Sequence, residues 1–449
     1  MNRTLALGTV SLVTALAFAA PGPAPDGAKF WPQWRGPLAS GAAPAGDPPV
    51  QWSESQNIKW KLAIPGLGSS TPIVWGDRIY VLTAISTDKP APAAAAAEPP
   101  AGSGPRRGPR GVTPTHIQQF AVLAISRKDG KILWQRVVRE ALPHEGHHPT
   151  NTWASHSAVT DGERIYAYFG SNGLYCLDMN GSVKWEKDFG DMTTRNGFGE
   201  GASPALASGK LVVIWDHEGE DFIVALDSKT GKELWRTARE EPTSWSTPLV
   251  VEHAGKKQIF TSATNRVRSY DLETGKLLWE GPGLTPNAIP SPVAGDGMVY
   301  ATSGFRGNAL LAIRLAAAQG DISASADAIA WKYDRDTPYV PSPLLYDGQI
   351  YILKSNNGIL TTFDAKTGEK IYGEQRIEAV PNVYASPVGA AGRVYIAGRE
   401  GSVAVIQHGR DFKLLAANKL DDGFDASPVV VDKELYLRGR KSLYCIAEK

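Results

Sequence analysis

Cysteine, net charge and long apolar runs are all scarce in this sequence. Its 449 residues contain only two cysteines, Cys176 and Cys445. This excludes a disulfide scaffold and any zinc or iron–sulfur site built from cysteines alone, because such sites need about four thiolates. The formal net charge is +1, so no chain-wide basic surface for nucleic acid is expected. Beyond residue 20, no apolar run approaches the ~20 residues that a membrane-spanning helix needs.

The first 20 residues differ from the rest of the chain. Arg3 precedes an apolar stretch from Leu5 to Phe18, and Ala17-Phe18-Ala19 has the small-x-small form of a signal-peptide cleavage site. We therefore expect a secretory signal over residues 1–19, cleaved after Ala19 or Ala20, and a periplasmic or secreted mature chain. An uncleaved anchor is the alternative. No cysteine lies near the cleavage site, which argues against lipid-anchored maturation.

A short pattern recurs eight times along the chain. It consists of Ser or Thr, usually followed by Pro, then a short apolar run, a turn with Gly or Asp, and an apolar-Tyr-apolar strand. Aligned on the Pro, or on Ala158 in the second copy, the first step is 86 residues and the later steps are 41 to 51 residues. The copies are "SSTPIVWGDRIYVLT" at 69, "SHSAVTDGERIYAYF" at 155, "GASPALASGKLVVIW" at 201, "WSTPLVVEHAGKKQIFT" at 245, "IPSPVAGDGMVYATS" at 289, "VPSPLLYDGQIYILK" at 340, "YASPVGAAGRVYIAG" at 384 and "DASPVVVDKELYLRG" at 425.

Most copies continue with a second hairpin, clearest in "ALDSKTGKELW" (225–235) and "SYDLETGKLLW" (269–279). Short runs rich in Val, Ile, Tyr and Trp between turn residues are typical of strands. In the turns, an Asp carboxylate accepts backbone hydrogen bonds and Gly adopts the positive φ that the hairpin needs. Four strands in about 44 residues, repeated eight times, predict an all-β chain folded as an eight-bladed β-propeller with four-stranded antiparallel blades.

The last copy ends one strand short, and the segment "QNIKWKLAI" (56–64) supplies the missing strand, with Trp60 at the repeat's Trp position. We expect this N-terminal strand to complete the C-terminal blade and close the ring. The predicted organisation is a signal at 1–19, an extension at 20–49 and one propeller at 50–449. An Ala/Pro/Gly-rich stretch at 86–115 is predicted to be a disordered loop.

Tryptophan recurs at one position of the outermost predicted strands. Large rings at equivalent positions of adjacent repeats are explained by packing between blades. An aromatic stack that holds a cofactor is the alternative for these six residues, but we interpret them as core: Trp60, Trp134, Trp185, Trp235, Trp279 and Trp331.

"WPQWRGP" (31–37), the "ALDxxTGxxxW" hairpins and the "SP" strand openings resemble the PQQ-binding-like β-propeller repeat proteins. That family includes the quinoprotein alcohol dehydrogenases and the BamB-type propeller lipoproteins of the outer-membrane assembly machine. The resemblance to the dehydrogenases implies pyrroloquinoline quinone (PQQ) over a vicinal disulfide, a Ca²⁺ site of Glu, Asn and Asp, and a carboxylate base. Here the two cysteines stand far apart in "LYCLD" and "LYCIA", and the lipobox cysteine of the BamB type is missing. We therefore predict no cofactor, with PQQ and calcium as the alternative.

The loops before each "SP" differ from copy to copy and are expected to meet at one mouth of the central channel. Aromatic, amide and charged side chains in such a place suit a flat ligand, a sugar or a peptide. The alternative is that the aromatics fill the channel. The opposite face, built from tight hairpins, is expected to offer no concavity. Basic residues such as Arg399 and Arg440 also lie in loops expected on the same face as the loops before each "SP". The predicted ligand-binding residues are Trp153, Arg195, Glu200, Trp245, Asn382, Tyr384 and Asp425.

"HEGHH" (144–148) matches the zinc-protease pattern H-E-x-x-H. That chemistry needs both histidines on one face of a helix, whereas Pro143 and Pro149 enclose only five residues, one of them Gly146. We predict no metal site. A looser site formed by His144, His147, His148 and His156 is the alternative.

Taken together, these features predict an exported, non-catalytic propeller that binds a protein or glycan at the channel face. It is expected to be monomeric, without nucleic acid and without a membrane span. A PQQ-dependent dehydrogenase with a degenerate site and a metal-dependent enzyme that uses the histidine loop are the alternatives.

Overall fold

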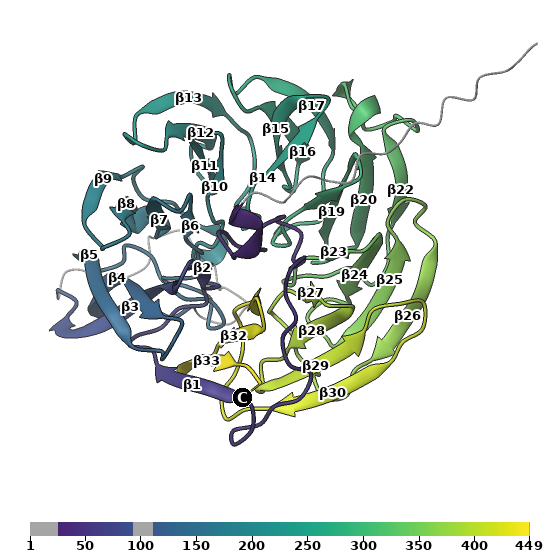
Figure 1. Cartoon of the computed structure of the whole chain (residues 1–449). Helices are drawn as coiled ribbons and strands as arrows, with labels where there is room; N and C mark the ends of the chain where they lie inside the picture. Colours follow the sequence, from purple (N-terminus) through teal and green to yellow (C-terminus); the bar gives the residue numbers. More distant parts are fainter. Residues whose placement is uncertain (1–25, 93–110, 449) are drawn as a thin grey trace, which may run out of the picture.

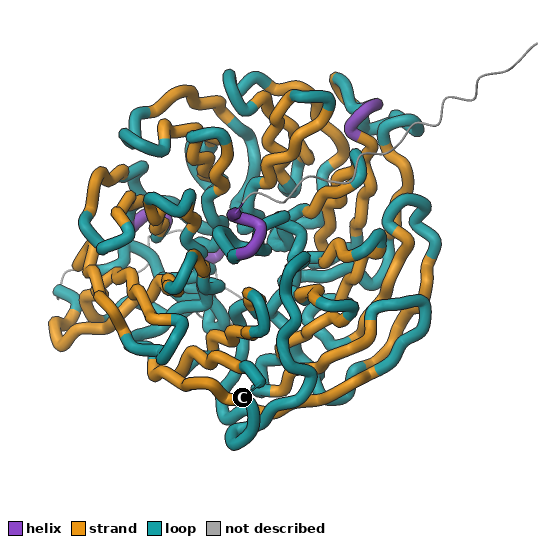
Figure 2. The backbone as a smooth tube through the Cα atoms, viewed as in Figure 1, coloured by secondary structure: helices purple, strands orange, loops and turns teal. Residues whose placement is uncertain are grey.

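The computed structural model describes residues 26–92 and 111–448. These residues form eight antiparallel sheets arranged as blades around a central axis (Figure 1). Seven sheets have four strands and one has five. Strands and loops make up almost all of the described chain, which contains only short 3-10 turns besides (Figure 2). The eight-bladed all-β fold predicted from the repeats is confirmed. The signal predicted at residues 1–19 lies outside the described residues.

Each blade runs from an inner strand at the channel to an outer strand at the rim. Blades 1 to 4 comprise β2 (Ile73–Trp75), β3 (Arg78–Pro90), β4 (His116–Ser126) and β5 (Ile132–Ala141); β6 (Val159–Thr160), β7 (Arg164–Tyr168), β8 (Leu174–Asp178) and β9 (Val183–Lys187); β10 (Ala205–Ala207), β11 (Lys210–Trp215), β12 (Phe222–Asp227) and β13 (Glu233–Ala238); and β14 (Leu249–His253), β15 (Lys256–Thr261), β16 (Arg266–Asp271) and β17 (Leu277–Pro282), with β21 (Gly320–Asp321) added in parallel.

The second half of the ring repeats this order. Blades 5 to 8 comprise β18 (Val293–Gly295), β19 (Met298–Ser303), β20 (Ala309–Arg314) and β22 (Ile329–Tyr333); β23 (Leu344–Tyr346), β24 (Gln349–Leu353), β25 (Ile359–Asp364) and β26 (Lys370–Arg376); β27 (Val388–Ala390), β28 (Arg393–Ala397), β29 (Ser402–Gln407) and β30 (Leu414–Lys419); and β31 (Val429–Val431), β32 (Glu434–Arg438) and β33 (Ser442–Ile446), with β1 (Ile58–Ala63) as the outer strand.

The ring closes where the sequence predicted it would. Strand β1 pairs antiparallel with β33, and Trp60 lies opposite Cys445. The same seam has further cross-links: Arg127 of blade 1 donates to Glu434 at 2.8 Å and to Asp432 at 2.9 Å in blade 8. A closed ring of this kind leaves no unpaired seam between the first and last blades.

The repeated Ser/Thr before each inner strand forms a second closure, at the channel. In each blade the backbone N–H of this residue donates to the hydroxyl of its counterpart in the next blade, at 2.8 to 3.1 Å. The last of these bonds runs from Ser427 to Thr71 and completes the circle. The eight residues are Thr71, Ser157, Ser203, Thr247, Ser291, Ser342, Ser386 and Ser427. The repeat therefore prefers Ser or Thr because each hydroxyl satisfies a buried amide of its neighbour.

The tryptophans of the outer strands pack between blades, as predicted. The indole of Trp185 donates to Ser228 O in the next blade at 3.1 Å, and that blade's turn glycine, Gly231, lies against the ring at φ 70°. Trp60, Trp134, Trp235 and Trp331 make the corresponding contact. Trp279 differs: its indole donates to Gln258 of its own blade, and β21 pairs alongside it.

Two faces follow from this topology. We call the side with the connections that lead into the inner strands the loop face. The other side, the hairpin face, carries the turns between the first and second and between the third and fourth strands of each blade, the latter including 227–231, 271–275 and 364–368. In each of these three turns the Asp carboxylate accepts from the Thr three residues later, at 2.7 to 2.9 Å.

The predicted extension crosses the hairpin face as a strap over residues 30–50. It starts after the 3-10 turn η1 (Asp26–Lys29), near the ring centre in Figure 1, and bridges Val74, Gly389 and Asp432 of blades 1, 7 and 8. Arg35 of the strap is 2% exposed and donates to the carbonyl oxygens of Pro343 at 2.7 Å and Pro387 at 2.9 Å.

The expectation that the hairpin face offers no concavity is wrong. The strap lies over blades 3 and 4 and leaves a mostly apolar cavity of about 210 Å³ beneath Gln33 and Ala39. This cavity was not predictable from the sequence because it depends on the path of a segment without a periodic pattern.

The insertion in blade 1 is partly strand. Of the residues 86–115 predicted to be a loop, Ser86 to Pro90 continue β3 and pair as far as Pro90 with His116. Residues 93–110 lie outside the described part of the chain.

Candidate functional site

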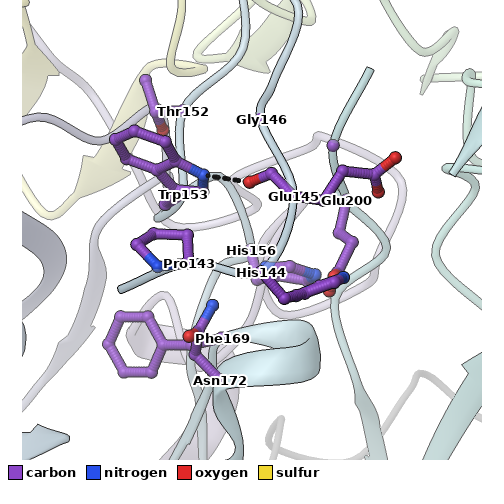
Figure 3. A pocket seen from close by; sticks show the side chains of 11 residues that line it. Pro143, His144, Glu145, Gly146, Thr152, Trp153, His156, Phe169, Asn172 and Glu200 are labelled. Carbon is purple, nitrogen blue, oxygen red and sulfur yellow. Dashed lines mark hydrogen bonds between the residues drawn. The ribbon is translucent and has the colours of Figure 1, made fainter. Parts of the chain in front are cut away.

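A small pocket opens on the loop face between the connection 142–158 and the loops of blades 2 and 3 (Figure 3). We call it the loop-face pocket. Its cavity of about 20 Å³ has room for one water-sized group. It is lined by Pro143, His144, Glu145, Gly146, Thr152, Trp153, His156, Phe169, Asn172, Gly199 and Glu200.

Two hydrogen bonds fix the carboxylate of Glu200 at this pocket. Ser171, in the 3-10 turn η3 (Gly170–Asn172), donates to the carboxylate from its backbone N–H at 2.8 Å and from its hydroxyl at 2.6 Å. The carboxylate lies so close to Gly170 that a Cβ there would meet Glu200 Oε2 at 1.3 Å. Burial raises the pKa of Glu200 to about 7, against the opposing effect of the Ser171 hydrogen bonds. Glu200 can therefore exchange a proton near neutral pH.

His156 and Tyr168 stand beside this carboxylate. Their rings meet edge to face at a centroid distance of 4.7 Å, and both are almost fully buried. His156 Nδ1 and the Tyr168 hydroxyl have no hydrogen-bond partner. Burial lowers the pKa of His156 to about 3, so the imidazole is neutral near pH 7.

The histidines of "HEGHH" are held apart from one another. This segment is a loop, in which His147 bridges to Val112, and not a helix. His144 Nε2 contacts Met192 O at 2.8 Å, His147 Nδ1 contacts His148 O at 2.8 Å, and His148 Nδ1 contacts the Thr150 hydroxyl at 2.8 Å. Across residues 26–92 and 111–448, no three His, Cys, Asp or Glu side chains are grouped so as to hold a metal ion.

A second cluster of predicted residues lies on the loop face of blades 7 and 8. Asp425 accepts from Arg399 Nε at 2.5 Å and from Arg440 Nε at 2.9 Å. The Arg399 guanidinium lies 4.1 Å from the centroid of the Tyr384 ring, and the Arg399 backbone N–H donates to Asn382 O. Asp425, Tyr384 and Asn382 therefore form one charged and aromatic surface, which we call the arginine cluster.

The two sites approach each other through the connection 142–158. Burial lowers the pKa of His148, and the charge of Arg399 lowers it further. His148 therefore lies within electrostatic reach of the arginine cluster, while Trp153 of the same connection lines the loop-face pocket.

The structure places the remaining predicted residues differently. Trp245 is only 9% exposed, and its indole donates to Gly199 O at 2.6 Å. It supports the glycine-rich segment beside Glu200 from behind instead of presenting a ring to a ligand. Arg195 belongs to the turn η4 (Arg195–Gly197) and is anchored through its backbone N–H to the Thr243 hydroxyl.

Sequence reasoning missed Ser171 and gave His156 only as a metal ligand. Ser171 lies in a loop within a blade, between β7 and β8, and no repeated motif marks that loop. The buried position of His156, directly before the repeated Ser157, could have marked it as a channel-side residue.

The PQQ and calcium site implied by the dehydrogenases does not fit the residues present. Cys176 and Cys445 are buried in β8 and β33, and burial raises the pKa of each thiol to about 12. Neither can cover a cofactor in the channel. Of the candidate carboxylates, Glu200 is bound by Ser171 and Asp425 by two arginines.

In the described residues, no helix has the length and apolar character needed to cross a membrane.

Comparisons with known proteins agree with the fold and identify the family. Outer membrane protein assembly factor BamB of Yersinia pestis is 25% identical over 342 residues, which cover 71% of this chain and 77% of the relative. BamB from Moraxella catarrhalis superposes with a TM-score of 0.55 at 16% identity, covering 82% of this chain and all of that one. A europium-containing methanol dehydrogenase gives a TM-score of 0.61 at 12% identity, covering 92% and 90%. At such identities the two structures show the fold alone.

A family model matches most of the chain. The model described as outer membrane protein assembly factor BamB matches residues 118–371 and 220–449, which together span 118–449. The chain therefore belongs to the BamB family of outer-membrane assembly propellers.

Proposed function

We propose that this chain is an exported, monomeric and non-catalytic propeller that holds a partner on its loop face as an accessory factor in outer-membrane protein assembly. Its family membership supports the assembly role, because the relative from Yersinia pestis carries that description. The predicted signal at residues 1–19 supports a periplasmic location. A protein is the favoured partner, with a glycan as the alternative.

The observation that carries the choice of face is the arginine cluster. Tyr384 is partly exposed and packed by Arg399, and Asp425 holds Arg399 and Arg440 in position. Rigid aromatic and arginine side chains in a fixed arrangement are the residues that most often dominate the energy of protein interfaces. On the hairpin face, the strap instead runs from near the ring centre across the blades (Figure 1).

The test is complementation in cells from which the gene has been deleted. Loss of the chain should lower the amount of folded β-barrel protein in the outer membrane, and the wild-type copy should restore it. Tyr384→Ala and Arg399→Ala should restore it poorly at equal abundance. The charge reversals Lys229→Glu and Lys366→Glu, in hairpin-face turns, should restore it fully.

Two results would contradict the proposal. Unchanged outer-membrane proteins in the deletion strain would rule out the assembly role. Full activity of the loop-face variants, with loss only in the lysine variants, would place the binding surface on the hairpin face.

A further inference from the structure

The cavity beneath the strap has buried apolar side chains in its lining and charged or amide side chains at its edge. We propose that it binds a small uncharged molecule whose body is a single ring and whose head is one hydroxyl or carbonyl group. This site lies on the hairpin face, opposite the surface assigned to the partner, so it goes beyond the proposed function and does not depend on it.

Two neighbouring blades supply the apolar walls of the cavity. Ala205 of β10 and Leu249 of β14 line it and are only 5% and 4% exposed, and Leu206 beside them is half-buried. Figure 1 shows both strands at the channel, close to the purple start of the strap. Just before these strands, the Ser203 N–H donates to the Thr247 hydroxyl at 2.9 Å. This bond fixes the spacing of the two strands at one end, so the walls are held apart.

The size of the cavity matches one ring. Its volume is about 210 Å³, and an apolar cavity of about 150 Å³ is enough to bind benzene. The difference leaves room for one or two further heavy atoms. Water is a poor occupant, because a buried water needs about two to four polar partners and the most deeply buried lining side chains are alanine, proline and leucine. A rigid ring also loses less conformational entropy on binding than a flexible alkyl chain.

The charges at the edge of the cavity balance each other. Glu252 and Lys257 both belong to the lining, and their charged atoms lie 3.9 Å apart. Lys257 Nζ also donates to the Ser208 hydroxyl at 2.7 Å. A ligand with a charged head would meet one charge of its own sign as well as one of the opposite sign, and it would also lose part of its hydration. An uncharged head avoids both costs.

One amide of the lining is available to such a head. The Gln33 side chain is half-buried, and within residues 26–92 and 111–448 its amide has no hydrogen-bond partner. An amide offers two N–H donors and one carbonyl acceptor, so it can pair with either a hydroxyl or a carbonyl group. Gln33 belongs to the strap, whereas the apolar walls belong to the blades. The ligand is therefore held between strap and blades, with its ring inward and its head at Gln33.

The test uses three one-ring probes of similar size: p-cresol, which is uncharged at pH 7, and the charged molecules benzylammonium and benzoate. Binding to the purified chain is followed by NMR titration of the labelled methyl groups of Leu206 and Leu249. p-Cresol should bind saturably at one site, and each charged probe should bind at least tenfold more weakly. Ala207→Leu fills the cavity from β10 and should weaken p-cresol binding at least tenfold. The control Ala294→Leu makes the same change on β18 of blade 5, outside this lining, and should leave the affinity within twofold.

A second variant keeps the test decisive if Ala207→Leu does not fold. Gln33→Leu removes the amide at the edge of the cavity and should weaken p-cresol binding at least threefold. The matched control Gln51→Leu, at an exposed position just after the strap, should leave it within twofold. Equal affinity for the three probes, no shift of either methyl signal, or an unchanged affinity in Gln33→Leu would overturn the proposal and leave a water-filled cavity. Complementation reports on the loop face, so failure of one test leaves the other conclusion standing.

Discussion

On the hairpin face, turns 227–231, 271–275 and 364–368 repeat the same Asp–Thr hydrogen bonds and the same positive-φ glycine. On the loop face, the connections of the same blades share only the Ser/Thr ring at their ends. Between those ends one connection places Glu200 in the loop-face pocket, and another places Tyr384 against Arg399. Positions where every blade has the same residue serve packing and turn geometry. Positions where the residue differs from blade to blade are available for recognition. The hairpin face also carries one element that does not repeat, the strap, which bridges blades 1, 7 and 8.

The largest expected effect comes from opening the ring at β1, because both faces depend on the closed ring. Deleting residues 50–64 removes β1 and with it Trp52 and Trp60, which are buried in the largest core cluster. The loss of stability should exceed about 5 kcal/mol, since losing even one buried tryptophan costs about 3–5 kcal/mol. Thermal unfolding followed by circular dichroism measures it. A truncated chain that melts like the full chain would show that β1 does not close the ring.

The next effect comes from a change in the strap, which should lower stability without changing the loop face. Arg35→Ala removes the donors to Pro343 O and Pro387 O and leaves both carbonyl groups buried. We expect a loss of about 3 kcal/mol, because each buried unsatisfied polar group costs about 1–3 kcal/mol. Urea unfolding gives the value. Complementation of the deletion strain at equal abundance should be unchanged, and a loss there would mean that the two faces are coupled through the channel.

The third effect is confined to the loop face and depends on pH. The pKa of Glu200 is raised to about 7, above its unfolded value near 4.5, so the folded state keeps a proton that the unfolded state loses between these two pH values. Stability should therefore fall as pH rises from about 4.5 to 7, by up to about 3 kcal/mol.

Glu200→Gln should remove this fall of stability with rising pH. His156, with its pKa lowered to about 3, acts in the opposite direction: stability falls as pH drops below about 6.5. His144, Glu145 and Tyr168 also face Glu200, so the difference between wild-type and Glu200→Gln urea curves at several pH values isolates its share. If the stability of the wild type and of Glu200→Gln changed with pH in the same way, the raised pKa of Glu200 would be contradicted.

The smallest effect compares two glycines of the hairpin face. Gly209 and Gly231 have φ of 73° and 70°, so alanine is strained at both. An added Cβ meets nothing within 4 Å at Gly209, whereas at Gly231 it meets the Trp185 ring at 2.7 Å. We expect a loss of about 1 kcal/mol for Gly209→Ala and about 2–3 kcal/mol for Gly231→Ala. Equal losses would mean that the glycine-on-tryptophan contact adds nothing to blade packing.

The repeats made the blades predictable, because strand, turn and Trp signals recur at a fixed spacing. Trp60 placed the closing strand for the same reason. The strap was not predictable, because Arg35 binds carbonyl oxygens more than 300 residues away and no local pattern marks them. Of the residues predicted from their place before a repeat, Glu200 and Trp153 line the loop-face pocket. The sequence could not show that Trp245 turns inward to Gly199, or that Ser171 meets Glu200, since both depend on packing between neighbouring blades.

The most direct test of the central claim is hydrogen–deuterium exchange of the chain with and without the protein that co-purifies with it from periplasmic extract. The account predicts that the partner slows amide exchange in the loop-face segments 143–157, 195–201, 382–387 and 398–401. Exchange in the hairpin turns 227–231, 271–275 and 364–368 and in the strap should stay unchanged. Slower exchange in those turns or in the strap, with none on the loop face, would contradict it.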